Sequence, residues 1–146
     1  MGQNRFVVAA LALAFVVPAS AKTINRDLGG NLREYHHDRL ALLASGEPVR
    51  FGGQCGSACT IYLALPLNQT CITRLAWFQF HAADDPDQAE AIRSTAWLYN
   101  EYPWWVRKWI DRNGGLTERI ITMSNAYAAK YLNRCRNGTY SHTRRT

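Results

Sequence analysis

The fold is indicated most clearly by VRFGGQCGSACTIYLAL, residues 49–65. Its first three residues are typical of a strand, Gly52-Gly53 of a turn, and the apolar run from Ser57 to near Pro66 of a helix. A serine where a strand turns into a helix exposes its hydroxyl, and the free N–H groups of the first helical turn can bind an anion. Ser57 is therefore either an ordinary helix N-cap or a nucleophile.

A histidine that can serve as a base, His81, lies 24 positions later and ends the strand-rich segment 71–80. Earlier in the chain, a strand at 23–25 precedes a Gly29-Gly30 turn and a helix from an Asn31 cap to about residue 44. This alternation implies parallel strands with crossover helices, hence an α/β fold. Ligands bind beyond the carboxyl ends of such strands. Gly29-Gly30, Ser57 and His81 each follow a strand, so they should meet at one edge.

The second half of the sequence predicts a helical part. Helices are expected at 89–102 and 104–112, separated by Pro103 and followed by a cap at 113–115, and a last helix should run from Thr117 toward Leu132. Aromatic side chains gather around Pro103: Trp97, Tyr99, Tyr102, Trp104, Trp105 and Trp109. Trp104 and Trp105 cannot both face inward on one helix, so both a packed core and an exposed patch are expected.

Residues 1–21 have the pattern of a secretory signal peptide, with Arg5, an apolar stretch and a small-residue cleavage site. One domain is expected at 22–135 and a flexible basic tail at 136–146. The protein should therefore be periplasmic or secreted, with no membrane span after cleavage. The net charge is +6, but without a dense basic block interleaved with aromatics a nucleic-acid partner is not expected.

Four cysteines, all after residue 21, suggest two disulfides with three alternative pairings. Their spacing matches no common zinc pattern, and the adjacent pair His36-His37 would point about 100° apart on a helix. No metal or other cofactor is predicted.

The segments 27–31, 53–60 and 80–81 together resemble the ClpP/crotonase superfamily, in particular small exported bacterial ClpP-like proteins with a Cys-x-Ser-Ala-Cys-Thr core. The similarity covers residues 23–82 well and residues 83–135 more weakly. It implies a mostly parallel sheet with crossover helices, here truncated at its N-terminal end. It also implies that Ser57 is the nucleophile and His81 the base, with oxyanion donors at Gly30 (or Gly29) and Ala58.

The resemblance further favours a Cys55–Cys59 disulfide around the serine, which leaves Cys71 for Cys135; a Cys55–Cys71 pairing is the alternative. ClpP enzymes carry an acidic residue after the histidine, and this chain has none at a matching place. The nearest candidates for the third member of the triad are Asp111, Glu118 and Asn125.

Two functions are consistent with these features. The first is an exported serine hydrolase that cleaves a peptide or an ester through an acyl-enzyme at Ser57, alone or in an oligomer. The second is a catalytically inactive, disulfide-linked ClpP-like domain that binds a protein or envelope partner. The serine hydrolase is the function predicted here, and the inactive binding domain is the alternative.

Overall fold

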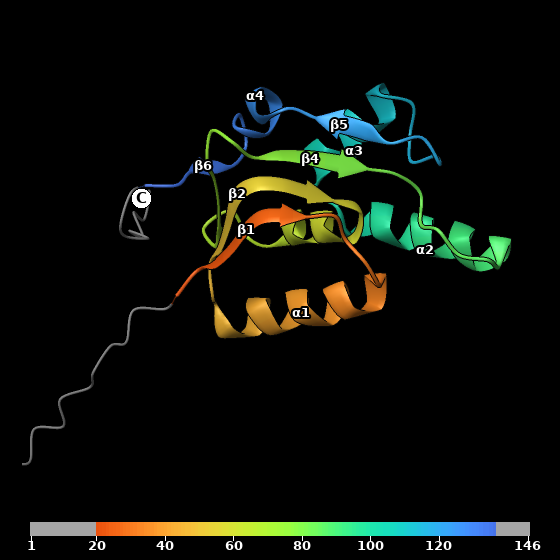
Figure 1. Cartoon of the computed structure of the whole chain (residues 1–146), viewed down its shortest axis with the longest axis horizontal. Coiled ribbons are helices and arrows are strands. Elements are labelled where there is room, and N and C mark those ends of the chain that lie inside the picture. The colour runs from red at the N-terminus through yellow and green to blue at the C-terminus, as the bar shows by residue number, and fades with distance from the viewer. Residues whose placement is uncertain (1–19, 137–146) are drawn as a thin grey trace, which may run out of the picture.

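The central strand of the sheet is β2 (Val49–Gly56), which has neighbours on both sides. The computed structural model describes residues 20–136 (Figure 1). The other strands are β1 (Lys22–Asp27), β3 (Thr70–Ile72), β4 (Trp77–Phe80), β5 (Ile121–Met123) and β6 (Asn133–Arg134). The helices are α1 (Leu32–Ser45), the 3-10 helix η1 (Ser57–Ala64), α2 (Gln88–Glu101), α3 (Trp104–Arg112) and α4 (Asn125–Ala128).

The sheet is mixed, and four of its five strand pairings are parallel. On one side β2 pairs with β1; on the other, its first half pairs with β3 and its second half with β4. β6 continues the sheet beside β3, and β5 is antiparallel to β4. The predicted α/β class is thus confirmed, with an antiparallel strand added. The closer assignment to a ClpP/crotonase-like fold stays a prediction.

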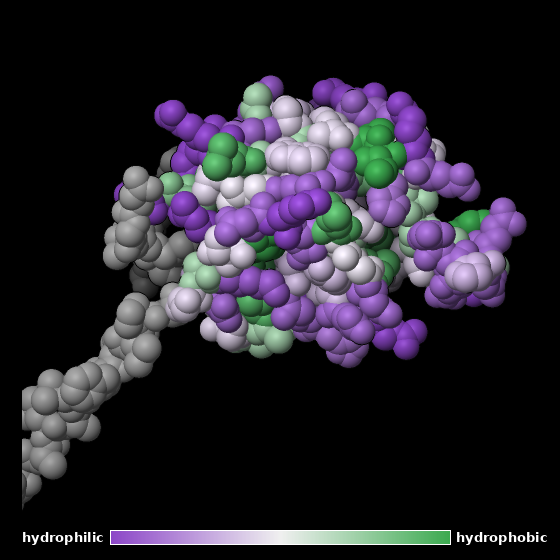
Figure 2. Space-filling view, viewed as in Figure 1, coloured by the Kyte–Doolittle hydropathy of each residue, from purple (hydrophilic) through white to green (hydrophobic). Residues whose placement is uncertain are grey.

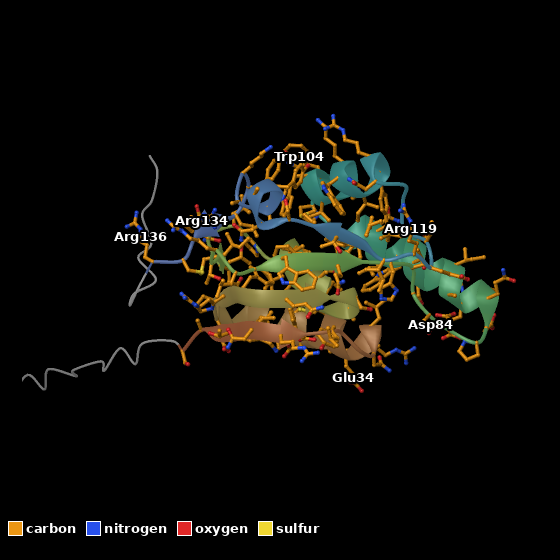
Figure 3. All side chains as sticks on the ribbon, turned by 45° about the horizontal axis from the view of Figure 1, so that its top comes forward. Glu34, Asp84, Trp104, Arg119, Arg134 and Arg136 are labelled. Atoms are coloured by element: carbon orange, nitrogen blue, oxygen red, sulfur yellow. A yellow bond between two sulfur atoms is a disulfide. The ribbon has the colours of Figure 1, made fainter. Side chains whose placement is uncertain are left out.

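Helices α1 and α3 follow local sequence signals at their ends. The side chain of Asn31 accepts hydrogen bonds from the amides of Arg33 and Glu34, and Gly46 ends α1 at φ +71°. α3 starts directly after Pro103. Trp105 on α3 is 3% exposed and Trp104 is 59% exposed, as expected for neighbours on one helix. Trp104 points away from the body of the protein in Figure 3.

The expected turn at Gly52-Gly53 is wrong, because both glycines lie inside β2. A Cβ atom on Gly53 would lie 1.9 Å from the carbonyl oxygen of Asn25 in β1. β1 shifts register between Ile24 and Arg26, next to this glycine. The lack of a side chain at Gly53 therefore allows β1 and β2 to approach each other closely, which is a common role of glycine inside a strand.

The expected helix from Thr117 toward Leu132 is also wrong. Ile121 and Met123 are buried on either side of exposed Thr122, which is the alternation of a strand, and they form β5 against β4. The chain then makes the short α4 and pairs as β6 with β3, where the amide of Cys135 donates to the carbonyl of Ile72. The helical part thus consists mainly of α2 and α3. The helix after Ser57 is also shorter and tighter than expected, since it is a 3-10 helix that ends at Ala64.

Both disulfides have the pairing that the resemblance favours, Cys55–Cys59 and Cys71–Cys135. The first encloses Ser57, and the second joins β3 to the residue after β6. Two disulfides fit a protein of an oxidising compartment. Across residues 20–136, no helix combines the length and the apolar character needed to cross a bilayer. On the face shown in Figure 2, hydrophobic side chains form separate spots among hydrophilic ones. The segments predicted as a signal peptide and a basic tail lie almost wholly outside the described residues.

Candidate active site

The carboxyl ends of three parallel strands lie at one edge of the sheet, and the candidate residues follow them. β1, β2 and β4 point the same way in Figure 1. Gly30, Ser57, Ala58 and His81 line one cleft with a volume of about 760 Å³. In Figure 2 the surface is indented beside the projecting start of α2. The structure therefore brings together the segments that the sequence predicts to meet.

Ser57 has a strained backbone at the point where β2 becomes η1. Its φ of +53° makes it the one non-glycine residue with positive φ in the described part of the chain. For an L-residue this conformation costs about 1–2 kcal/mol and persists only where the surroundings enforce it. The Cys55–Cys59 disulfide spans the turn, and the hydroxyl of Thr60 donates to the Ser57 carbonyl at 2.6 Å.

A buried hydroxyl behind this turn completes its support. The Tyr102 phenol lies 2.5 Å from Thr60 Oγ1. Because the Thr60 proton is donated to Ser57, Tyr102 must be the donor to Thr60. Burial raises the pKa of Tyr102 well above its ordinary value, so the phenol keeps its proton. The Thr60 hydroxyl thus holds the Ser57 carbonyl, and the Tyr102 phenol in turn holds the Thr60 hydroxyl.

The Gly29-Gly30 turn packs directly against Ser57. Gly29 has φ +84°, and a Cβ atom there would lie 2.6 Å from Ser57 Cβ and 2.7 Å from the Ala58 nitrogen. Its amide donates to Asp27 Oδ1 at 2.9 Å, so it is already engaged. The Gly30 amide has no hydrogen-bond partner within residues 20–136. Of the two glycines proposed as oxyanion donors, Gly30 is therefore the one with an available N–H, together with Ala58 on the same cleft.

Asp27 is itself held in place by Tyr35 from α1. The Tyr35 phenol donates to Asp27 Oδ1 at 2.6 Å. Burial and this hydrogen bond raise the pKa of Tyr35 above its ordinary value, so it stays a donor. The Asp27 carboxylate therefore links the end of β1 to α1 and fixes the Gly29 amide between them.

His81 is oriented by a backbone group. Its Nδ1 lies 2.6 Å from the carbonyl oxygen of Ala82. A carbonyl oxygen only accepts, so in this hydrogen bond the proton is on Nδ1 and the lone pair of the neutral ring is on Nε2. No hydrogen bond joins His81 to Ser57 in the described structure.

The three side chains considered as third triad member are not hydrogen-bonded to His81. Asp111 accepts from the Tyr99 phenol at 2.8 Å, which raises the pKa of that phenol. Asn125 donates to two carbonyls of the β3–β4 connection. Glu118 is exposed. No carboxylate forms an ion pair with His81 among residues 20–136.

Helices α1 and α2 form the walls of the cleft. Leu32, Trp97 and Leu98 supply apolar surface, and Arg93 is paired with Glu90 at 2.7 Å. In Figure 3, Glu34 and Asp84 mark this end of the molecule. His36 packs edge-on against Trp97, with ring centroids 4.8 Å apart. Residues 20–136 contain no group of three or more His, Cys, Asp or Glu side chains able to hold a metal ion.

Thr60 and Tyr102 are the supporting residues that sequence reasoning missed. Thr60 lies three positions after Ser57, a spacing typical of a hydroxyl that bonds to the main chain, so a signal for it existed. Tyr102 is 42 positions from Thr60, and only the packing of η1 near α2 brings the two together.

No protein-family model matches the chain, and no curated protein matches its sequence.

Proposed function

We propose that the chain is an exported, ClpP-like serine hydrolase that cleaves an amide or ester bond through an acyl-enzyme at Ser57. The observation that supports this most is the convergence of Gly30, Ser57, Ala58 and His81 on one cleft from three strand ends. A nucleophile, a base and two amide donors are the groups that acyl transfer requires. The two disulfides are compatible with a periplasmic or secreted location.

In the proposed reaction, Ser57 Oγ attacks the substrate carbonyl carbon while its proton passes to His81 Nε2. The amides of Gly30 and Ala58 donate to the oxyanion. When the bond to the leaving group breaks, His81 returns the proton to the departing amine or alcohol. Water then attacks the acyl-enzyme and gives a proton to His81, which passes that proton to Ser57 Oγ as the bond to the acyl group breaks and the acid leaves.

The Ala82 carbonyl performs part of the role that the carboxylate has in a complete triad, because it accepts the hydrogen bond from His81 Nδ1. In a Ser-His-Asp triad the carboxylate fixes the tautomer and orientation of the imidazole and stabilises its protonated form. The carbonyl fixes the tautomer equally well, but it carries no charge. We therefore expect slower acylation than in a complete triad. The missing Ser57–His81 hydrogen bond is not decisive, since such bonds often tighten only with substrate bound.

The test is labelling of the disulfide-intact protein with a fluorophosphonate probe. We expect labelling of the wild type, none of Ser57→Ala, and a rate about 10²–10⁴ times lower in His81→Ala. Ser94→Ala is the matched control, because Ser94 lines the same cleft but is hydrogen-bonded to Glu90. Equal labelling of wild type and Ser57→Ala would contradict the proposal.

The second candidate is an inactive domain that binds a partner. It is favoured by the absence of a carboxylate behind His81 in the described structure. It predicts that folded wild-type protein, verified by circular dichroism, is not labelled at all.

A further inference from the structure

Thr95, on the face of α2 toward the β4–α2 connection, is hydrogen-bonded to the peptide unit that orients His81. Thr95 Oγ1 accepts from the amide of Ala83 at 2.9 Å and donates to the carbonyl of Ala91 at 2.7 Å. The Ala83 amide and the Ala82 carbonyl belong to one peptide group. That carbonyl is the acceptor for His81 Nδ1.

Peptide planarity makes this connection rigid. In a trans peptide the N–H and the C=O point in opposite directions within one plane, so a hydrogen bond that fixes the N–H also fixes the C=O. The Thr95 hydroxyl donates its one proton to the Ala91 carbonyl, so toward the Ala83 amide it acts as an acceptor through a lone pair. The amide of Ala82 is held from the other side by the Thr117 carbonyl at 2.7 Å. The Ala82 carbonyl therefore has little freedom to turn away from His81.

We propose that Thr95 is a positioning residue: it holds the Ala82–Ala83 peptide so that the Ala82 carbonyl keeps the His81 proton on Nδ1 and the lone pair on Nε2. Chained hydrogen bonds polarise one another, so the Thr95 contact also strengthens the carbonyl as an acceptor. The effect on the tautomer stands by itself, whereas the effect on catalysis rests on the proposed hydrolase function.

A purely structural role predicts a different result. Thr95 could serve only to bond back to its own helix, as threonines in helices often do. Its replacement would then alter stability but leave the His81 ring unchanged. The tautomer is therefore the readout that separates the two roles.

The variants are Thr95→Val, which keeps the shape and removes the hydroxyl, and Thr95→Ser, which keeps the hydroxyl. Thr122→Val is the matched control, since Thr122 is exposed on β5 and its hydroxyl has no hydrogen-bond partner in residues 20–136. Nitrogen-15 NMR of the His81 ring is recorded over a series of pH values, and the tautomer is determined from the spectra in which the ring nitrogen shifts are those of the neutral imidazole.

We expect the Nδ1–H tautomer to dominate in the wild type, in Thr95→Ser and in Thr122→Val, and a substantial Nε2–H population in Thr95→Val. We also expect the fluorophosphonate labelling rate of Thr95→Val to fall about tenfold, the size of one lost hydrogen bond, with recovery in Thr95→Ser. An Nε2–H ring in the wild type would overturn the inference whether or not any variant folds. So would an unchanged tautomer in folded Thr95→Val. If the tautomer shifts as expected but no protein is labelled, the positioning role stands and the proposed hydrolase function fails.

Discussion

Replacing Gly29 with alanine should break the contact between the Gly29-Gly30 turn and Ser57. The alanine at position 29 must keep the backbone φ of +84°. Its methyl group would lie only 2.6–2.7 Å from Ser57 Cβ, the Ala58 nitrogen and the Gly56 carbonyl oxygen. The backbone conformation costs about 1–2 kcal/mol. Overlap with main-chain atoms that cannot rotate away adds about 1–3 kcal/mol. We therefore expect a loss of about 2–5 kcal/mol in the free energy of unfolding, or a displaced turn with lost labelling of Ser57.

Gly46→Ala separates the two contributions. Gly46 has φ +71°, and a Cβ atom there has no neighbour within 4 Å. This variant should lose only the conformational part, about 1–2 kcal/mol, and keep wild-type labelling. Urea unfolding of both variants with equal slopes gives the comparison. The reasoning is refuted if Gly29→Ala is no less stable than Gly46→Ala and is labelled at the wild-type rate.

Three further outcomes are expected. By the chain-entropy model, removing the Cys71–Cys135 disulfide should lower the free energy of unfolding by about 4 kcal/mol, and removing the Cys55–Cys59 disulfide should lower it by about 2 kcal/mol. Only the loss of Cys55–Cys59 should slow the labelling of Ser57. Slower labelling only after the loss of Cys71–Cys135 would contradict this. Asn125→Ala should lower stability by about 1–3 kcal/mol with labelling of the folded fraction unchanged, whereas a loss as large as in His81→Ala would make Asn125 the third triad member. Burial raises the pKa of the Asp38 carboxyl, but hydrogen bonds from Lys22 and Tyr62 lower it by more, so that the pKa in the folded protein is below its ordinary value. The stability that the Asp38 carboxylate contributes is therefore present above the pKa of the unfolded state and is lost as the pH falls through the pKa of the folded state. Unfolding titrations of wild type and Asp38→Asn should accordingly converge below about pH 3.9, and a pH-independent difference would disprove the assignment.

The parts of the fold that depend on local sequence were predictable. The Asn31 cap, the break at Pro103 and the opposite exposure of Trp104 and Trp105 follow from neighbouring residues alone. The errors arise where distant contacts decide. Gly53 lies within a strand because β1 passes close to it, which its immediate neighbours do not reveal.

The end of the domain shows the same limit. From Thr117 onward the sequence is compatible with a helix. In the structure, however, β5 pairs with β4, and the disulfide from Cys135 to Cys71 holds the end of the domain beside β3. Neither partner is near in the sequence. The cysteine pairing itself was predicted only through the resemblance, because four cysteines alone allow three arrangements.

The candidate site likewise has one part that the sequence predicts and one part that depends on contacts the sequence does not reveal. The strand-end positions of Gly30, Ser57 and His81 predicted one shared edge, and the structure brings them to one cleft. The partner of His81 could not be predicted from residue types, because the acceptor is a main-chain carbonyl that every residue possesses. The candidates for the third triad member were the carboxylates of Asp111 and Glu118 and the neutral amide of Asn125, and none of them is hydrogen-bonded to the ring.

Locating the fluorophosphonate adduct by tandem mass spectrometry in wild type and His81→Ala tests the proposed active site most directly. The account predicts one phosphonyl group per chain, on the peptide that contains Ser57, and a strongly reduced yield without the imidazole. An adduct on another residue, or equal modification of Ser57 in both proteins, would contradict it.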